Sequence, residues 1–277
     1  MSGETTRRRS VVLVSGAEDV SVFDGALQAL QSEETDVHTI QLPGFGRSEH
    51  NLSTLSGESI CEAVTSELLE RSPGCRVILA GHSMGGLAVL AAGADRKVRE
   101  QLRLERLVLL APSFSLADPI VRRVCGVLAR LDSGNLDRLC RGTIVRTAAR
   151  RLNNALLRLK FPCGKMPFRR MYAETCKGSA EPACFASGVL LPEQAPVNML
   201  SLFYGLICRA LNAAGKITAP IVLVEAEDDR WVPHCSAAVL ERLNPSLYLT
   251  LPGGHFFPAY RPDAVVNAVT QDIAHIG

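Results

Sequence analysis

The sequence contains no apolar run close to the roughly 18–20 residues that a membrane-spanning helix needs, and no internal repeat or low-complexity tract. Four apolar residues, Val11 to Val14, follow the basic start of the chain, whereas the core of a signal peptide takes about 7–15. Nine cysteines are scattered without a Cys-x-x-Cys pair, so they form no zinc or redox motif and are interpreted as reduced thiols. These absences predict a cytoplasmic protein without a transmembrane segment.

The 277 residues suffice for one large domain, or for a core domain with an inserted subdomain. The net charge of +2 hides an asymmetry, because thirteen Lys and Arg stand against two acids between Val121 and Arg170. This polarity predicts either a segment that meets a negatively charged partner or helix faces with solvated arginines. The segment shows no interleaved aromatic residues and no recognised binding motif, so nucleic acid is a poor fit.

Short apolar runs alternate with helical patterns near both ends of the chain. Such runs are typical of a parallel sheet with helices on both faces, because both faces of each strand are buried. We expect strands at Val11–Ser15, Val37–Leu42, Arg76–Ala80, Leu107–Leu110, Ile221–Val224 and Tyr248–Leu251. The expected helices are Val22–Leu30, Ser56–Leu69, Ser236–Leu243 and a last one near Ala264–Ile276.

The alternation stops between Leu116 and Gly215, where the pattern is helical with two breaks rich in Gly, Pro and Cys and with no convincing strand. A helical insertion between strands of such a sheet predicts a cap over the active site. The chain is therefore divided into a first core part (1–115), a helical basic cap (116–215) and a second core part (216–277).

A Gly-x-Ser-x-Gly motif stands at residues 81–85, directly after the apolar run Val77–Ala80 and directly before another apolar run. A turn from a buried strand into a helix is so tight that the positions two residues from its centre must be nearly free of side chain. Gly81 and Gly85 meet that need. The hydroxyl of Ser83 is then exposed at the carboxyl edge of the sheet, beside N–H groups that begin a helix. The motif predicts a serine nucleophile.

A serine hydroxyl is a poor nucleophile unless a base takes its proton, and that base is usually a histidine oriented by a carboxylate. In this architecture the acid and then the histidine follow the serine, on loops after later strands. The acid loop reads Glu-Ala-Glu-Asp-Asp from Glu225 to Asp229, and His255 follows the last expected strand. The other five histidines lack such a context, and His82 is expected to pack beside the nucleophile or to line the pocket.

Four motifs in this order resemble the α/β-hydrolase superfamily over nearly the whole chain. They are Leu-Pro-Gly-Phe-Gly-Arg-Ser at 42–48, Gly-His-Ser-Met-Gly-Gly at 81–86, Asp-x-x-Val-Pro at 229–233 and Gly-His-Phe at 254–256. The resemblance implies an α/β fold with a mostly parallel sheet of about six strands, helices on both faces and an inserted helical cap. It also implies Asp229 as the acid, His255 as the base, and neither a metal nor an organic cofactor.

Two N–H groups in such enzymes hold the negative oxygen that develops on the substrate. One belongs to Met84, the residue after the nucleophile. The other comes from the loop after the first strand, where this chain has Ser15-Gly16-Ala17 and relatives mostly have His-Gly-x, so Ala17 is the expected donor. Glu18 and Asp19 follow directly, and they suit an anion site only if their side chains turn outward.

The chain is thus predicted to be a carboxylic-ester hydrolase that acts through an acyl-enzyme on Ser83. The 42–48 motif and Ala-Pro-Ser-Phe-Ser-Leu-Ala-Asp at 111–118 resemble pimeloyl-[acyl-carrier-protein] methyl ester esterases, which dock an acidic carrier on a basic lid. Gly-His-Ser-Met-Gly-Gly and Ala-Glu-Asp-Asp-Arg resemble lysophospholipases and monoacylglycerol lipases. The alternatives are such a lipase, a C–C bond hydrolase or thioesterase with the same triad, and a non-catalytic ligand receptor of the same fold.

Two sets of residues in the expected cap are candidates for binding. An apolar stripe either lines the substrate pocket or fills the interior of the cap, and it contains Met199, Phe203 and Tyr204. Clustered basic residues raise encounter rates with anionic partners, here an acyl carrier protein or an anionic lipid surface. The basic candidates are Arg122, Arg123, Arg150 and Arg151.

Overall fold

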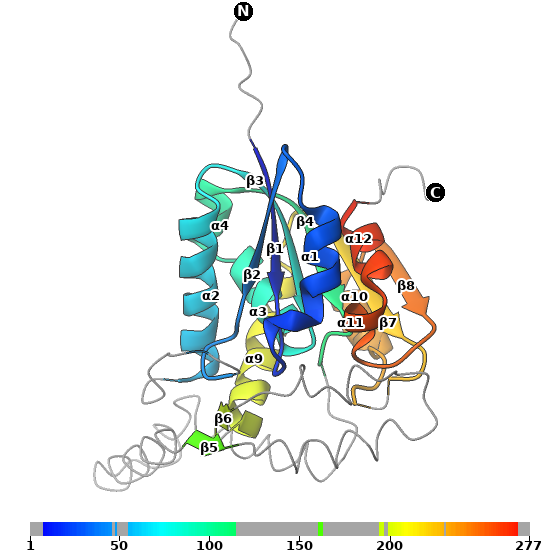
Figure 1. Ribbon diagram of the computed structural model, residues 1–277. Coiled ribbons are helices and arrows are strands. Elements are labelled where there is room, and N and C mark those ends of the chain that lie inside the picture. The colour runs from blue at the N-terminus through cyan, green and yellow to red at the C-terminus, as the bar shows by residue number, and fades with distance from the viewer. Residues whose placement is uncertain are drawn as a thin grey trace, which may run out of the picture.

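The computed structural model describes residues 8–45, 48, 55–114, 160–162, 194–196, 199–229 and 231–270. Six parallel strands form one sheet in the order β2-β1-β3-β4-β7-β8 (Figure 1). The prediction of a mostly parallel sheet of about six strands is confirmed. The strands are β1 (Arg9–Val14), β2 (Thr35–Ile40), β3 (Arg76–His82), β4 (Arg103–Leu110), β7 (Ile221–Ala226) and β8 (Leu247–Leu251).

Helices cover both faces of this sheet (Figure 1). Side chains alternate along β1, so that Val12 and Val14 lie in one buried core and Val11 and Leu13 in the other. The first core is closed by α2 (Gly57–Arg71), α3 (Met84–Gly93), α4 (Arg96–Gln101), α9 (Met199–Ala214) and α10 (Ala237–Leu243). The second is closed by the 3-10 helix η1 (Val20–Phe23), α1 (Asp24–Leu30), α11 (Phe257–Tyr260) and α12 (Pro262–Thr270).

Helix α2 illustrates how local sequence sets these elements. The Ser56 hydroxyl accepts the N–H of Ser59 at 3.1 Å, and the Ser59 hydroxyl accepts the N–H of Ser56 at 2.7 Å. This reciprocal cap satisfies N–H groups that have no partner inside the helix. Ile60, Val64 and Leu68 follow at four-residue spacing and are fully buried in the first core. The spacing places them on one face of the helix.

Several small elements differ from the sequence prediction. The expected helix at Val22–Leu30 is divided between η1 and α1, and the sequence pattern did not indicate α4 or α11. The expectation of no strand between Leu116 and Gly215 is wrong, because β5 (Lys160–Pro162) pairs antiparallel with β6 (Gln194–Pro196). Strands of three residues that each end in proline are too short to show an alternating pattern.

Most of the segment predicted as a cap lies outside the described residues, so the division at 116 and 216 stays a prediction. Its described end, α9, packs against α2 and α3. Leu202, Leu206 and Ala210 of α9 are fully buried in the first core. This part of the predicted cap therefore packs against helices of the α/β core.

The strand order places the functional loops at one edge of the sheet. The chain leaves β1 for β2 on one side, then crosses back to β3 and continues to β4 on the other side. In open parallel sheets a ligand binds beyond the carboxyl ends of the strands where the order reverses, which here lies between β1 and β3. The loop after β1 and the turn that carries Ser83 meet at that place.

Candidate active site

Ser83 occupies a strained turn between β3 and α3. Its φ of 55° and ψ of −120° are rare for a residue with a side chain, and its backbone N–H donates to the Leu110 carbonyl at 2.9 Å. The turn depends on glycine at two flanking positions. A β-carbon on Gly81 would collide with the backbone of Gly85, and one on Gly85 would collide with the carbonyl at the end of β1. The predicted strand, turn and helix are thus present, with Ser83 at the centre.

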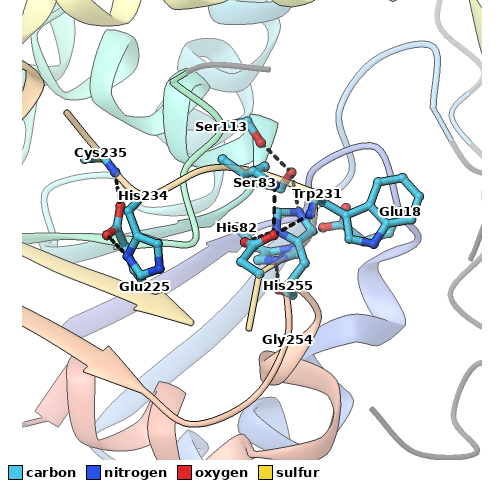
Figure 2. A network of polar contacts seen from close by, with 12 residues as sticks. Glu18, His82, Ser83, Ser113, Glu225, Trp231, His234, Cys235, Gly254 and His255 are labelled. Carbon is cyan, nitrogen blue, oxygen red and sulfur yellow. Dashed lines mark hydrogen bonds and ion pairs between the residues drawn. The ribbon is translucent and has the colours of Figure 1, made fainter. Parts of the chain in front are cut away.

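Figure 2 shows the side chain of Ser83 directed at the ring of His255. The distance from His255 Nε2 to Ser83 Oγ is 3.0 Å, and that from His255 Nδ1 to Asp229 Oδ2 is 2.6 Å. A carboxylate only accepts hydrogen bonds, so the proton of the neutral ring is assigned to Nδ1. Nε2 is then free to accept the Ser83 O–H. The three residues predicted as a triad therefore form one continuous hydrogen-bonded chain.

Asp229 differs from its acidic neighbours in burial and bonding. Its side chain is 5% exposed, whereas Glu227 and Asp228 are exposed. Its Oδ1 accepts the backbone N–H groups of Trp231 and Val232, each at 2.8 Å. Burial raises the pKa of Asp229, but the neighbouring His255 and these hydrogen bonds outweigh it, so the pKa lies below the ordinary value of 3.8. The group is therefore an anion at neutral pH and favours the proton on Nδ1 of His255.

The loop after β1 lies directly against the nucleophile. A β-carbon on Gly16 would stand 2.8 Å from the Cβ of Ser83, so only glycine permits this approach. The Gly16 N–H donates to Glu18 Oε1 at 2.6 Å and is occupied. Ala17 is half-buried, and among the described residues its N–H has no hydrogen-bond partner. Met84 begins α3, so its N–H has no partner within the helix.

From the sequence, an anion site beside Glu18 was expected only if its side chain turned outward. In the structure the side chain turns inward. The carboxylate is 2% exposed and its Oε1 lies 2.7 Å from Nδ1 of the fully buried His82 (Figure 2). Asp19 remains half-buried and accepts the N–H of Ser21 at 3.0 Å. Sequence reasoning missed the contact because it joins residues on separate loops. A buried carboxylate beside an anion site is tolerable here because an imidazole faces it.

Ser113 was not singled out from the sequence as a site residue. Its Oγ lies 3.0 Å from Ser83 Oγ, its N–H donates to the Ser83 carbonyl at 3.3 Å, and it is 3% exposed. Because the Ser83 O–H is directed at His255, the Ser113 hydroxyl is the donor to Ser83 Oγ. Its position in the sequence could have indicated it as a site residue. Ser113 follows the expected strand Leu107–Leu110 and so lies at the same edge of the sheet as Ser83.

A second cluster supports the loop that carries Asp229. Glu225, near the end of β7, accepts hydrogen bonds from His234 Nδ1 at 2.9 Å and from the Cys235 N–H at 2.7 Å (Figure 2). It also accepts the Tyr248 hydroxyl at 2.6 Å. The carboxylate is buried and its two oxygens are both occupied. These bonds join the two ends of the acid loop to β8.

The predicted binding residues are only partly described. Phe203 is 4% exposed and belongs to the first core. The side chains of Met199 and Tyr204 lie outside the described part of the structure, as do all four arginines of the basic set: Arg122, Arg123, Arg150 and Arg151. Their proposed contacts therefore stay predictions.

Neither a metal centre nor a membrane span is found in the ranges that the structure describes. No group of three His, Cys, Asp or Glu among these residues could hold a metal ion. No described helix combines the length and apolarity that crossing a membrane requires.

Known proteins of solved structure share the fold of this chain. No curated protein matches the chain in sequence. Among solved structures, a monoacylglycerol lipase from Paleococcus ferrophilus has a TM-score of 0.62 at 18% identity, covering 96% of this chain and 94% of that one. A thioesterase domain from the curacin biosynthetic pathway has a TM-score of 0.56 at 16% identity, covering 96% of this chain and 92% of that one. E-2-(acetamidomethylene)succinate hydrolase has a TM-score of 0.57 at 17% identity, covering 95% of this chain and 90% of that one. At such identities the likeness concerns the fold.

The family comparison is more specific. The model of the alpha/beta hydrolase family matches residues 11–268, a range that contains the strained serine turn, the acid loop and the histidine loop. The match covers most of the chain and agrees with the six-stranded parallel sheet described above. The chain therefore belongs to the alpha/beta hydrolase family, and this membership supports a hydrolase.

Proposed function

We propose that this hydrolase cleaves carboxylic esters through a covalent acyl-enzyme on Ser83. The observation that carries the proposal is the continuous chain from Ser83 Oγ through His255 to Asp229, with contacts of 3.0 and 2.6 Å. The nucleophile stands at the start of a helix beside a glycine loop, which is the environment that stabilises developing negative charge.

In the first step Ser83 Oγ forms a bond to the acyl carbon while its proton moves to Nε2 of His255. Asp229 holds the resulting imidazolium, and the N–H groups of Met84 and Ala17 donate to the tetrahedral oxyanion. The carbon–oxygen bond to the alcohol then breaks, and His255 returns the proton to that oxygen. A water, deprotonated by the same histidine, attacks the acyl-enzyme and releases the carboxylic acid and Ser83.

The decisive experiment compares the wild type with Ser83→Ala on p-nitrophenyl esters with acyl chains of two to sixteen carbons. We expect turnover in the wild type and none above background in the variant, with unchanged circular dichroism. A fluorophosphonate probe should label the wild type once per chain and leave Ser83→Ala unlabelled. Turnover in the variant near that of the wild type would reject Ser83 as the nucleophile.

The single tryptophan offers a readout that does not need turnover. Trp231 is the only Trp in the chain, and its ring centroid lies 6.5 Å from that of His255. Covalent modification of Ser83 displaces the hydrogen bond of His255 and changes the surroundings of the indole. Trp231 emission should therefore change in step with probe labelling, whereas Ser83→Ala should show no change.

For the substrate, we propose an anionic acyl ester, such as one bound to an acyl carrier protein or presented on an anionic lipid surface. The support is the charge of residues 121–170, with thirteen Lys and Arg against two acids. Reversal of four charges, Arg122→Glu, Arg123→Glu, Arg150→Glu and Arg151→Glu, should lower kcat/KM on a carrier-bound ester and flatten its salt dependence. The matched control is Lys97→Glu with Arg99→Glu, exposed on α4, which should leave kcat/KM unchanged.

The same substrate panel separates the alternatives. Preference for the longest acyl chains with activation by lipid surfaces would favour a lysophospholipase or monoacylglycerol lipase. Turnover of thioesters or of C–C substrates without turnover of esters would favour those reactions on the same triad. Stoichiometric ligand binding in a folded protein without turnover would favour a receptor.

A further inference from the structure

Two buried ionisable side chains beside the nucleophile take no part in the chemistry proposed above. Glu18 and His82 are 2% and 0% exposed, and Glu18 Oε1 lies 2.7 Å from His82 Nδ1. The other ring nitrogen, Nε2, lies 2.8 Å from the backbone carbonyl oxygen of His255. Burying such groups costs free energy unless they are paired and hydrogen-bonded, so their arrangement requires an account.

The partners of His82 determine how many protons its ring carries. A backbone carbonyl only accepts hydrogen bonds, so Nε2 must carry a proton to bond to the His255 oxygen. An ionised Glu18 also only accepts, so Nδ1 must carry a proton too. Burial raises the pKa of Glu18, but His82 and the hydrogen bonds from His82 and Gly16 outweigh it and hold the pKa below the ordinary value of 4.5. Beside an ionised Glu18, both nitrogens of the His82 ring thus face groups that only accept hydrogen bonds.

The pair joins the two loops that complete the proposed site. On one side, Glu18 Oε1 accepts the Gly16 N–H at 2.6 Å, and the Glu18 carbonyl accepts Gln41 Nε2 at 3.0 Å. These bonds hold the loop that brings Gly16 against Ser83 and that carries Ala17. On the other side, His82 bonds to the main chain of His255, and the two rings lie 4.8 Å apart between centroids.

We propose that Glu18 and His82 form a buried ion pair that positions the oxyanion loop and the histidine loop relative to Ser83. The inference rests on the proposed ester hydrolysis, because it assigns these residues a role in that reaction. Both act as positioning residues, since neither contacts the nucleophile oxygen in the described structure. The imidazolium also offsets a carboxylate that would otherwise repel the developing oxyanion.

The first test is the protonation state of His82 in the wild type. In a protein labelled with ¹⁵N at histidine, both ring nitrogens of His82 should be protonated at pH 8, with the signals assigned by their loss in His82→Asn. The groups against this ring are Glu18, which is titratable and charged when ionised, the titratable His255, and the apolar Phe256. A neutral His82, with the shared proton on Glu18, would overturn the ion pair.

The second test is kinetic and uses Glu18→Gln, His82→Asn and the double variant. Displacing catalytic groups by about 1 Å can cost on the order of 10²-fold in rate, so each single variant should lose about that much in kcat. KM should stay within about threefold, because substrate binding is not the property disturbed. The double variant should lose little more than either single variant, since both break one unit.

The matched control is Asp19→Asn, which removes a charge from the next residue of the same loop and should retain wild-type kcat. An equal loss in Asp19→Asn, or multiplied losses in the double variant, would overturn the positioning role. If Glu18→Gln does not fold, His82→Asn and the wild-type spectrum still decide the question. A wild type without turnover but with a doubly protonated His82 would reject the proposed hydrolysis and support the ion pair.

Discussion

Replacing Asp229 by asparagine tests the proposed triad most sharply, because the surrounding hydrogen bonds dictate how the new amide must orient. Oδ1 of Asp229 accepts two backbone N–H groups at 2.8 Å, from Trp231 and Val232. An asparagine would keep its carbonyl oxygen there and turn its NH₂ group toward His255. His255 would then have to accept at Nδ1 and carry its proton at Nε2, where it could no longer take the proton of Ser83.

The structure also bounds the size of the effect. In the variant, His255 can recover its active tautomer only if the new amide at position 229 flips. The flip leaves the two buried backbone N–H groups of Trp231 and Val232 facing an NH₂ group. Each unsatisfied donor costs about 1–3 kcal/mol, so the flip costs about 2–6 kcal/mol in total. At about 1.36 kcal/mol per tenfold, kcat should fall by between about 30-fold and about 10⁴-fold. The upper limit is about the loss expected for a triad held entirely in the wrong tautomer.

The assay is steady-state hydrolysis of the best p-nitrophenyl ester, with Asp228→Asn as the matched control. Asp228 is the adjacent exposed carboxylate, so its variant removes the same charge from the same loop and should retain wild-type kcat. Loss of activity in Asp228→Asn with activity kept in Asp229→Asn would move the acid by one residue. A kcat for Asp229→Asn within about threefold of the wild type would refute the tautomer argument.

Three further outcomes follow from the site. Gly85→Ala should lose about 1–3 kcal/mol of unfolding free energy and most activity, because its β-carbon meets the backbone at the end of β1. By contrast, Gly215→Ala, whose β-carbon meets nothing within 4 Å, should keep its urea midpoint. Ser113→Ala should lower kcat by about three- to tenfold, since one neutral hydrogen bond of about 0.5–1.5 kcal/mol to the nucleophile is lost. The pKa values of Glu18 and Asp229 are below 4.5 and 3.8, so below about pH 5 the unfolded chain binds more protons and stability should fall with falling pH. Urea unfolding from pH 6 to 3 should show a smaller fall in Glu18→Gln, and an equal fall in both proteins would contradict the assignment.

Local sequence was sufficient for much of the fold because the signals are local. Unbroken apolar runs such as Ile221–Val224 indicate strands buried on both faces. The observed strand begins at the same residue and ends slightly later, at Ala226. Gly81 and Gly85 indicate the tight turn around Ser83, because sterics alone forbid side chains there. Short elements such as β5 escaped detection, since three residues carry no period.

The order of nucleophile, acid and histidine, and the elements that hold them, could be predicted from sequence, because each depends on residues within a few positions of one another. The sequence also indicated Asp229 through a family motif, and the structure places that carboxylate against His255. That Glu18 turns inward to His82 and that Ser113 contacts Ser83 became apparent only in the folded chain. These contacts join residues 64 and 30 positions apart, and no local pattern encodes them. They arise because parallel strands bring the loops at their carboxyl ends together, where burial leaves a charged group stable only beside an opposite charge.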